Sequence, residues 1–466
     1  MIVITEKQGG FTMTQALSQP PVNAPQKTPK SRIKRVVAAS MAGTVAEWYE
    51  FFIYGTAATL VFGSLFFPKT GNPLDGIIAA FATYAVGFLA RPLGGMVFGH
   101  FGDRYGRKKL LQFSLLLVGA ATFLMGCLPG FQEIGYWAPA LLVLLRFLQG
   151  FAVGGEWGGA VLLVSEHSPQ NQRGFWASFP QAAAPVGNVL ATVVMLGLSW
   201  TLDQSSFMAW GWRIAFWLSA LIIFVGYMIR RTVEDAPVFI EAMRKQREAQ
   251  REAATLREVL RTYPAQITKA LIMRIGENSS YYLMIVFAIT YLTVHVKVEY
   301  STVLLVLFVA NIVQFFAMLG GGWLSDKIGR KRTIGIGYVG LLVWALTFFP
   351  ALDSGNFWAI LASTTFGLTV QAAAYAPQAA LMSEIFPTRM RYSGSSFTYQ
   401  IATIFAGSVA PMIATLLLNQ FNNTLPIVIY VVGILIISTV ALSMLKETRG
   451  LDLSSLDRIH ENELAR

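Results

Sequence analysis

Charged side chains interrupt several long apolar stretches of this chain, and they are its clearest candidates for chemistry. Placing an ionised side chain at the centre of a membrane helix costs about 2.5–3.5 kcal/mol, so such residues usually have a function. Seven ionisable residues occupy positions of this kind: Glu47, Glu50, Arg91, Arg146, Glu156, Arg274 and Glu277. We take these seven as the first candidate site residues.

The carboxylates and arginines among them suggest proton transfer. Glu47 and Glu50 lie three residues apart and share a helix face. Burial favours the neutral form of a carboxylic acid and a nearby guanidinium favours the charged form, so a change of arginine partner can load and release a proton. We expect Glu47 or Glu50 to carry a proton, with Arg146 as its modulator and Glu156 in the same group. The alternative is that these residues form structural ion pairs between helices.

Arg91 and Arg274 suggest the binding of a carboxylate. A guanidinium stays charged and binds carboxylates through two parallel hydrogen bonds. We expect the two arginines to hold a substrate carboxylate from opposite halves of the chain. The residues expected to complete that pocket are Tyr54, Tyr84, Gln181, Glu277, Asn278, Tyr281, Tyr282, Gln371, Tyr375 and Gln400.

Twelve apolar stretches are long enough to hold these residues inside a membrane. A hydrocarbon core of about 30 Å needs about 20 helical residues. Hydrophobic residues make up 54% of the 466 residues and charged residues 13%, about half the usual charged share. The expected spans are residues 36–66, 76–100, 110–128, 138–164, 173–200, 212–230, 268–295, 300–325, 333–351, 356–384, 392–419 and 425–445. The sequence thus predicts an all-α membrane protein with twelve transmembrane helices.

Basic residues predict the orientation of these helices. Of the 36 Lys and Arg residues, three lie within spans (Arg91, Arg146, Arg274), three lie in loops on one side (Lys69, Arg213, Lys297), and the remaining 30 lie on the side that both termini share. Positively charged loops face the cytoplasm. Both termini are therefore expected there, with residues 1–34 and 447–466 as cytoplasmic tails and the first of these disordered.

Two kinds of segment occur twice, which indicates a duplicated chain. The turn with Gly99, Asp103, Arg104, Gly106 and Arg107 recurs 223 residues later with Asp326, Gly329 and Arg330. The segment Ser-Glu-x-x-Pro at 165–169 with Arg173 recurs 218 residues later at 383–387 with Arg391. Transporters with parallel repeats place their substrate site between the halves, near the bilayer midplane. We place two six-helix halves at 35–230 and 268–446, joined by a cytoplasmic linker at 231–267.

The two copies of Gly-x-x-x-Asp-x-x-Gly-Arg, together with the twelve spans, resemble the major facilitator superfamily over residues 35–450. Residues 46–55, 88–95 and 146–157 are more narrowly similar to the metabolite:proton symporter family. That family includes carriers for 2-oxoglutarate, citrate, shikimate and proline/betaine. The resemblance therefore implies the major facilitator fold and transport of a small metabolite with protons.

The resemblance also implies a role for the repeated turns. In family members the loop aspartate faces a helix terminus in the same half, and the arginines pair with carboxylates across the cytoplasmic seam. The residues of such a cytoplasmic gate would be Gly99, Asp103, Arg104, Gly106, Arg107, Asp326, Gly329 and Arg330. The alternative is that these charges only set the membrane topology.

The leading expectation is a secondary active transporter of the plasma (inner) membrane. It would import a small carboxylated metabolite with protons by alternating access, as a functional monomer in the lipid bilayer. A proton symporter for a zwitterion such as proline or betaine is the first alternative, and an efflux antiporter is the second.

Other classes of function are disfavoured. The net charge of +11 arises from residues scattered over short loops, which does not make a nucleic-acid-binding face. The single cysteine, Cys127, cannot form an intramolecular disulfide, and the four histidines lack metal-ligand spacing. No phosphate-binding loop and no nucleophile–base cluster stands out. We therefore expect no nucleic-acid partner, no cofactor, no metal and no enzymatic activity.

Overall fold

The computed structural model describes residues 30–68, 73–105, 107–154, 156–231, 256–407, 409–451 and 453, and all regular structure in these residues is helical. The first half contains α1 (Lys30–Ala57), η1 (Ala58–Phe62), α2 (Gly63–Leu65), α3 (Pro73–Tyr105), α4 (Arg107–Cys127), α5 (Phe131–Ile134), α6 (Trp137–Val153), α7 (Glu156–His167), η2 (Gln170–Gln172), α8 (Arg173–Thr201), α9 (Gln204–Ser206), η3 (Phe207–Gly211) and α10 (Trp212–Arg231).

The predicted second half is also helical in its described residues. It contains α12 (Leu256–Thr262), α13 (Pro264–Tyr282), η4 (Leu283–Phe287), α14 (Ala288–Thr290), η5 (Tyr291–Val296), α15 (Tyr300–Ile328), α16 (Arg330–Asp353), α17 (Phe357–Glu384), α18 (Thr388–Gly407), α19 (Val409–Phe421) and α20 (Leu425–Ser443). The segments η1, η3, η4 and η5 are π-helical and η2 is a 3₁₀ turn.

Nine helical segments of the described residues are long and apolar enough to cross a membrane. The other three predicted spans correspond to α1, whose first turns carry basic residues, to α4, and to α6 with α7. Two of these contain shorter apolar helices, Gln112–Cys127 and Trp137–Val153. Each of the twelve predicted spans thus coincides with a helix or a run of helices, which confirms the predicted fold class.

Some element boundaries differ from the predicted ones. The helix α1 begins at Lys30, inside the stretch expected to be a disordered tail, because Ile33 and Val36 pack against Val164 of α7. The sixth span begins at Gln204 and not at residue 212, since α9 and η3 lead into α10. Residues 1–29 and most of the predicted linker, residues 232–255, lie outside the described part of the chain.

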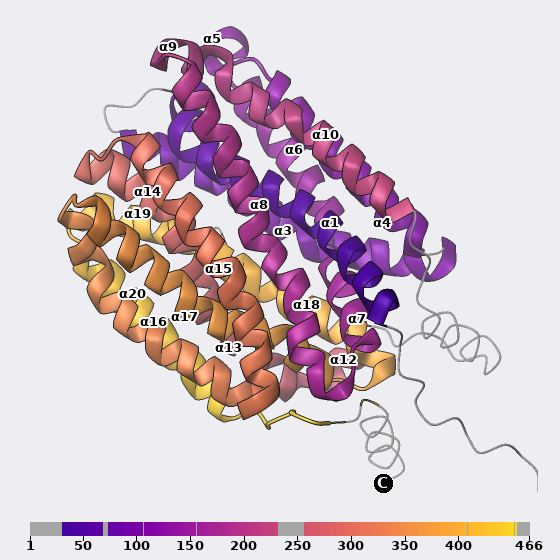
Figure 1. Ribbon diagram of the computed structural model, residues 1–466. Coiled ribbons are helices and arrows are strands. Elements are labelled where there is room, and N and C mark those ends of the chain that lie inside the picture. The colour runs from indigo at the N-terminus through magenta and orange to yellow at the C-terminus, as the bar shows by residue number, and fades with distance from the viewer. Residues whose placement is uncertain are drawn as a thin grey trace, which may run out of the picture.

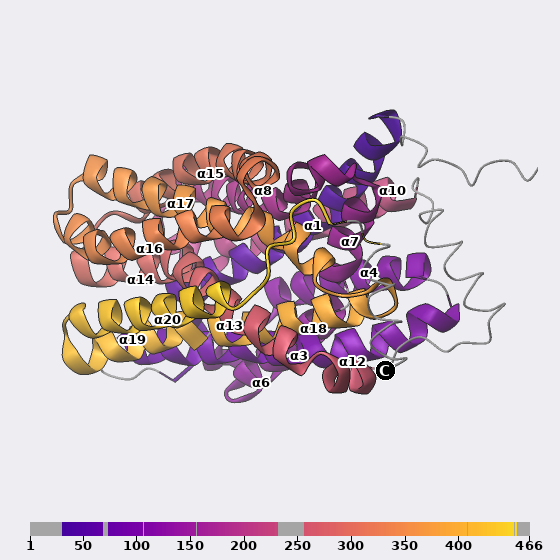
Figure 2. The ribbon, with the colours of Figure 1, turned by 90° about the horizontal axis from the view of Figure 1, so that it is seen from below.

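The helices form two groups that lie side by side. Figures 1 and 2 show α1 to α10 in indigo to magenta beside α13 to α20 in orange to yellow. Across the boundary α8 packs along α15, and α3 packs against α18 and α19. The candidate site residues on α1, α3, α6 and α13 lie on helices at or next to this boundary.

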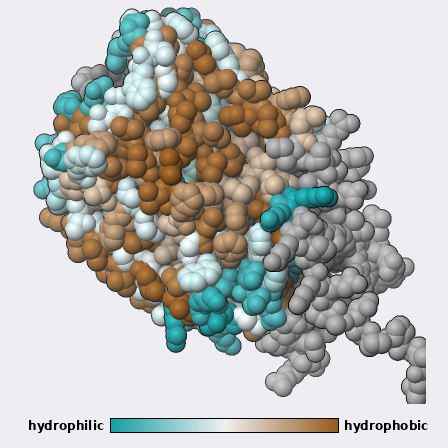
Figure 3. Space-filling view, in the orientation of Figure 1, coloured by the Kyte–Doolittle hydropathy of each residue, from teal (hydrophilic) through white to brown (hydrophobic). Residues whose placement is uncertain are grey.

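The outer surface is apolar where a lipid bilayer would cover it. Large apolar side chains are exposed on α15 and α16, among them Phe316, Val339 and Leu346. Figure 3 shows such residues gathered across the middle of one face, with hydrophilic residues toward its ends. Soluble monomers rarely expose apolar patches of this extent. The surface therefore fits a multi-pass membrane protein.

Glycines bring α3 and α6 close together. A Cβ atom at Gly150 would collide with the carbonyl oxygen of Gly87, and one at Gly154 would collide with that of Arg91. Small residues allow membrane helices to approach until their backbones touch. This contact sets the spacing between the helices that carry Arg91 and Arg146.

Gly150→Ala is expected to lower the thermal stability of the purified protein in detergent. The new methyl group meets a backbone atom that cannot rotate away, and overpacking of this kind costs roughly 1–3 kcal/mol. The matched control is Gly197→Ala, because nothing lies within 4 Å of a Cβ atom there. That change should be neutral or stabilising by up to about 1 kcal/mol, since alanine favours a helix more than glycine does. Equal melting temperatures for the two variants would contradict this account.

Candidate functional site

Glu50 of α1 accepts hydrogen bonds from two neutral side chains of neighbouring helices. Thr122 Oγ1 of α4 donates to Glu50 Oε2 over 2.8 Å, and Gln149 Nε2 of α6 donates to the same oxygen over 3.3 Å. Gln149 Oε1 accepts a hydrogen bond from Arg146, one turn earlier on α6. Glu50 is 1% exposed, and its Oε1 has no hydrogen-bond partner among the described residues. A neutral amide therefore connects this carboxyl group to a guanidinium.

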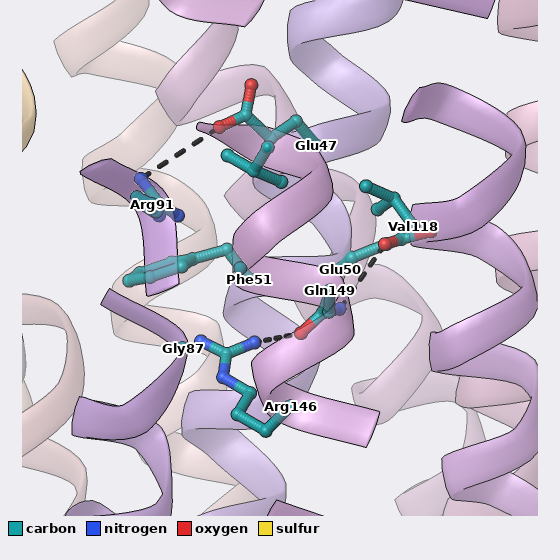
Figure 4. A pocket seen from close by; sticks show the side chains of 10 residues that line it. Glu47, Glu50, Phe51, Gly87, Arg91, Val118, Arg146 and Gln149 are labelled. Carbon is teal, nitrogen blue, oxygen red and sulfur yellow. Dashed lines mark hydrogen bonds and ion pairs between the residues drawn. The ribbon is translucent and has the colours of Figure 1, made fainter. Parts of the chain in front are cut away.

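Glu47, one turn before Glu50, has a different partner. Its Oε1 lies 4.0 Å from Arg91 Nη1 of α3, and both side chains are buried. Figure 4 shows the two groups on separate levels, with Glu47 and Arg91 above Glu50, Gln149 and Arg146. The two glutamates predicted to share a helix face therefore contact different neighbouring helices, Glu47 reaching α3 and Glu50 reaching α4 and α6.

A small cavity lies between these two groups (Figure 4). Its walls are Glu47, Glu50, Phe51, Gly87, Arg91, Val118, Arg146, Gln149, Gly150 and Val153. The free space available to the centre of a water molecule is about 10 Å³, roughly enough for one water and too little for a metabolite. In this conformation the cavity is suited to water beside the two carboxyl groups.

Aromatic rings cover both arginines of the first half. The Arg146 guanidinium lies 4.2 Å from the centre of the Tyr54 ring and 4.5 Å from that of Tyr84. The ring of Phe51 lies between Arg91 and Arg146, 5.6 Å and 5.8 Å from their guanidinium carbons (Figure 4). Such contacts stabilise a desolvated cation without neutralising it. Tyr54, predicted for the substrate pocket, therefore belongs with Arg146.

A second network of the same kind lies in the other half. Arg274 Nη1 of α13 donates to Gln378 Oε1 of α17 over 2.9 Å, and Gln378 Nε2 donates to Glu277 Oε2 over 3.4 Å. Gln371 Nε2 donates to Glu277 Oε1 over 3.2 Å. All four side chains are at most 1% exposed. The structure thus brings three predicted pocket residues, Arg274, Glu277 and Gln371, into one network around Gln378, which the sequence did not single out.

Tyr399 of α18 contacts the network around Arg274. Its ring centre is 3.7 Å from the Arg274 guanidinium, and its hydroxyl is 3.0 Å from that of Tyr375. Glu47 and Arg91 of the other half act electrostatically on the same hydroxyl. Nothing in the sequence distinguishes Tyr399 from a tyrosine that only packs in an apolar span.

Two other predicted pocket residues also lie where the halves meet. Gln181 Nε2 of α8 donates to the backbone carbonyl of Tyr375 of α17 over 3.5 Å. The Tyr282 ring lies 5.3 Å from that of Phe51 on α1, and its buried hydroxyl has no hydrogen-bond partner within the described part of the chain. Both residues therefore face the boundary from which a substrate would be held.

Arg91 and Arg274, which were expected to hold one substrate carboxylate together, have separate partners in this conformation. Each contacts a partner in its own half, Glu47 and Gln378 respectively. Among the ionisable candidates, Glu156 is the first residue of α7, and its side chain lies outside the part of the structure that is described.

The second copy of the repeated turn joins the halves at one end. Asp326, near the end of α15, accepts hydrogen bonds from the backbone N–H groups of Gly174 and Phe175 over 2.9 Å and 2.8 Å. A carboxylate at a helix N-terminus satisfies free N–H groups and complements the helix dipole. Arg330 Nη1 donates to the same carboxylate over 2.6 Å.

The aspartate of this copy therefore caps α8, a helix of the other half, whereas the family resemblance implied a terminus in the same half. The reason is that α8 and α15 pack along each other, which brings the start of α8 to the end of α15. Gly329 lies between α15 and α16 with a φ of 109°, a conformation that favours glycine. Of the first copy, Gly99 lies in α3, whereas Gly106 and the side chains of Asp103, Arg104 and Arg107 lie outside the described residues.

Glu384, the last residue of α17, strengthens the same junction. Its Oε1 lies 2.9 Å from Arg173 Nη1 of α8 and 3.2 Å from Arg330 Nη2. Thr448 Oγ1 donates to its Oε2 over 2.6 Å. Glu384 and Arg330 are 0% exposed and Arg173 is 4% exposed. The carboxylate is thus held directly by two guanidinium groups, one from each half.

A second ion pair crosses the boundary nearby. Arg391 Nη1 of α18 lies 3.5 Å from Glu166 Oε1 of α7. The glutamate of each copy of the Ser-Glu-x-x-Pro segment therefore pairs with the arginine of the other copy. The sequence carried a signal for this pairing, because each glutamate precedes its arginine by seven residues. From the sequence alone the repeat indicates only duplication.

Polar contacts also join the halves farther along the bundle. Asn188 Nδ2 of α8 donates to Asn311 Oδ1 of α15 over 3.3 Å, and the hydroxyls of Thr59 and Thr290 lie 3.2 Å apart. The two halves are therefore joined by polar contacts both at the Glu384 junction and away from it. Among the described residues, no group of three or more His, Cys, Asp and Glu side chains could hold a metal ion.

The chain is similar to known transporters over most of its length. A model of the Major Facilitator Superfamily matches residues 51–411 and 281–456. The inner membrane metabolite transport protein YhjE of Escherichia coli (strain K12) is 38% identical, covering 91% of this chain and 96% of the relative. The shikimate transporter of the same strain is 36% identical (90% and 96% covered), and its proline/betaine transporter is 30% identical (90% and 84% covered).

Solved structures support the same assignment at the level of the fold. The structure of the proton:xylose symporter XylE bound to 6-bromo-6-deoxy-D-glucose has a TM-score of 0.73 with 18% identity and covers 92% of this chain and 99% of its own. A partially occluded inward-open conformation of XylE from E. coli has a TM-score of 0.69 with 17% identity, covering 91% of this chain and 100% of its own. The family is one of transporters and not of enzymes. The chain belongs to the major facilitator superfamily, where it groups with metabolite transporters.

Proposed function

We propose that this protein is a secondary active transporter that imports a small carboxylated metabolite together with protons. The observation that carries the proposal is the environment of Glu50. Its carboxyl group is buried, is held by neutral donors and reaches Arg146 only through an amide. Such a group can change its protonation state without breaking a direct ion pair. We place the protein in the inner membrane, with both termini in the cytoplasm and as a functional monomer.

The substrate would be held where the two halves meet. Arg91 is the proposed carboxylate-binding group, because its ion pair with Glu47 is long, at 4.0 Å. A substrate carboxylate can replace Glu47 as the partner of Arg91. Glu47 would then be released as substrate binds, which couples the anion site to the nearby Glu50.

The proposed cycle uses the contacts at the two ends of the boundary in turn. The pairs of Glu384 with Arg173 and of Glu166 with Arg391, and the cap of Asp326 on α8, close the end that we assign to the cytoplasm. The contacts between Thr59 and Thr290 and between Asn188 and Asn311 would hold the halves together on the opposite side of the candidate site. Rocking of the halves would break one set while the other remains, which is alternating access.

A zwitterionic substrate such as betaine or proline is the second candidate. The observation in its favour is an aromatic cluster on α1 and α13, in which Trp48 stacks on Phe52 with ring centres 5.5 Å apart and lies 6.3 Å from Tyr281. Aromatic faces bind quaternary ammonium groups. Uptake of radiolabelled shikimate, 2-oxoglutarate, citrate, proline and betaine into energised membrane vesicles separates the candidates. Uptake of the last two alone would overturn the carboxylate proposal, and proton-driven expulsion of these compounds would indicate an antiporter.

Arg91→Lys is expected to raise the apparent KM for the carboxylate by about tenfold or more, because one charge-assisted hydrogen bond, worth about 1.5–3 kcal/mol, is lost. The maximum rate should change much less. Arg213→Lys is the matched control, since Arg213 binds only the backbone carbonyls of Gly126 and Leu128 among its hydrogen-bond partners in the described structure. An Arg91→Lys variant with the KM of the unaltered protein would show that the anion site lies elsewhere.

A further inference from the structure

We propose that Glu277 is a second proton-binding carboxyl group of the transport cycle, so that each half carries one. This inference rests on the proposed function and extends it to the number of protons carried. It starts from a repeated arrangement: in both halves an arginine donates to a glutamine oxygen, and the same glutamine donates to a glutamate. The members are Arg146, Gln149 and Glu50 in one half and Arg274, Gln378 and Glu277 in the other.

The two networks occupy corresponding helices. Each glutamate lies on the first long helix of its half, α1 or α13, and each glutamine lies on the fourth, α6 or α17. The arginines differ in position, since Arg146 shares α6 with its glutamine and Arg274 shares α13 with its glutamate. The same chain of hydrogen bonds, from arginine to glutamine to glutamate, therefore arises from different sequence positions in the two halves. The repeated sequence motifs do not contain these residues.

Both arginines are also covered by a pair of tyrosines. Arg274 lies 3.7 Å from the ring centre of Tyr399 and 5.2 Å from that of Tyr375. Tyr54 and Tyr84 cover Arg146 at 4.2 Å and 4.5 Å. The aromatic faces keep each cation stable at a fixed place while the carboxyl group beyond the amide gains or loses its proton.

The donors to Glu277 are suited to a group that titrates. Gln371 and Gln378 are neutral, and Gln371 is itself held by Gln314 over 2.7 Å. Glu384 shows the contrasting arrangement, with two guanidinium groups in direct contact. Neutral donors stabilise a carboxylate less than a direct ion pair does, so protonation of Glu277 costs less.

Among the charged and titratable groups around Glu277, Glu277 is the group expected to change its charge near neutral pH. They are Arg274 and Tyr281 of α13, Tyr338 of α16 and Tyr375 of α17, with Tyr399 of α18 over Arg274. Arginine and tyrosine both keep their protons near neutral pH. A proton from water would bind one oxygen of the carboxylate and later return to water on the other side, with no further reactant.

Infrared difference spectra of the purified full-length protein test this proposal without a transport substrate, because the probe is the proton. Spectra recorded between acidic and alkaline buffer should contain two bands of buried protonated carboxyl groups. Glu277→Gln is expected to remove one band and Glu50→Gln the other. The control Glu299→Gln alters an exposed residue of the loop before α15 and should leave both bands.

The outcomes separate this inference from the proposed function. If Glu277→Gln leaves the spectrum unchanged, the inference is overturned whatever Glu50→Gln does. If Glu277→Gln removes a band and Glu50→Gln removes none, the proton-binding role of Glu277 is supported and that of Glu50 is rejected. Gln378→Leu keeps the carboxyl group and removes a donor, so it should shift the frequency of the Glu277 band without abolishing it. An unshifted band in that variant would also overturn the inference.

Discussion

Glu50→Gln is expected to lower the steady-state accumulation of substrate by about tenfold for each pH unit of an imposed proton gradient. One proton carried down one pH unit supplies about 1.4 kcal/mol, which corresponds to about a tenfold concentration ratio. Glutamine keeps the shape of the side chain and can still accept the hydrogen bond from Thr122. It cannot bind and release a proton, so exchange of substrate across the membrane should remain while its coupling to that proton is lost.

The measurement uses proteoliposomes with a pH gradient and no membrane potential. Accumulation and substrate exchange are followed in the same preparation, which separates coupling from binding. Glu133→Gln is the matched control, because Glu133 lies exposed on α5 outside the long helices. Full accumulation by Glu50→Gln would remove it from the proton path. The double variant Glu50→Gln with Glu277→Gln should lose accumulation altogether if each half carries one proton.

Glu47→Gln should behave differently from Glu50→Gln. Its carboxylate lies 4.0 Å from Arg91, so its loss frees the proposed anion site of a competing charge. We therefore propose that Glu50 carries the proton and that Glu47 forms the substrate-linked ion pair. The sequence predicted both as candidates and had no means to choose between them.

Glu384→Gln is expected to open the gate formed by Glu384, Arg173, Arg330 and Asp326. The variant leaves the buried guanidinium groups of Arg173 and Arg330 side by side without their shared carboxylate. Removing one partner of a buried ion pair costs about 3–5 kcal/mol. Since Arg173 and Glu384 belong to different halves, much of this cost falls on the closed conformation alone. A difference of this size shifts the balance between closed and open states by roughly a hundred- to a thousand-fold.

A cysteine at position 178 can report this opening. Ser178 is 0% exposed and faces Gly322 across the boundary between α8 and α15. In a protein with Cys127→Ala and Ser178→Cys, reconstituted in lipid nanodiscs, Glu384→Gln should raise the rate of thiol labelling at least tenfold. Arg449→Ala is the control, because Arg449 is exposed beside the same junction. An unchanged labelling rate would show that the gate does not depend on Glu384.

Much of the architecture was predictable from local properties of the sequence. The twelve spans follow from runs of about 20 apolar residues, because a bilayer requires each crossing segment to satisfy its backbone hydrogen bonds as a helix. The predicted duplication rests on the turn around Asp326 and the similar turn around Asp103. Most of the Asp103 turn lies outside the described residues, so its role in a gate remains a prediction.

The partners of the charged residues were less predictable. Glu47 and Glu50 were expected to act on one face, yet one meets α3 and the other meets α4 and α6. Residues three apart on a helix differ in direction by about 60°, since each residue turns the helix by about 100°. In a closely packed bundle that angle is enough to reach a different neighbouring helix.

The sequence by itself determined that the protein is a set of membrane helices with charges buried at a few points, and its repeated motifs predict two related halves. Hydropathy and repeated motifs can be read directly from the order of the residues along the chain. Only the tertiary structure decided that Glu384 meets Arg173, that Asp326 caps α8 and that Gln378 links Arg274 to Glu277. Those contacts depend on how helices far apart in the chain rotate and slide against each other, which side-chain packing across the boundary sets.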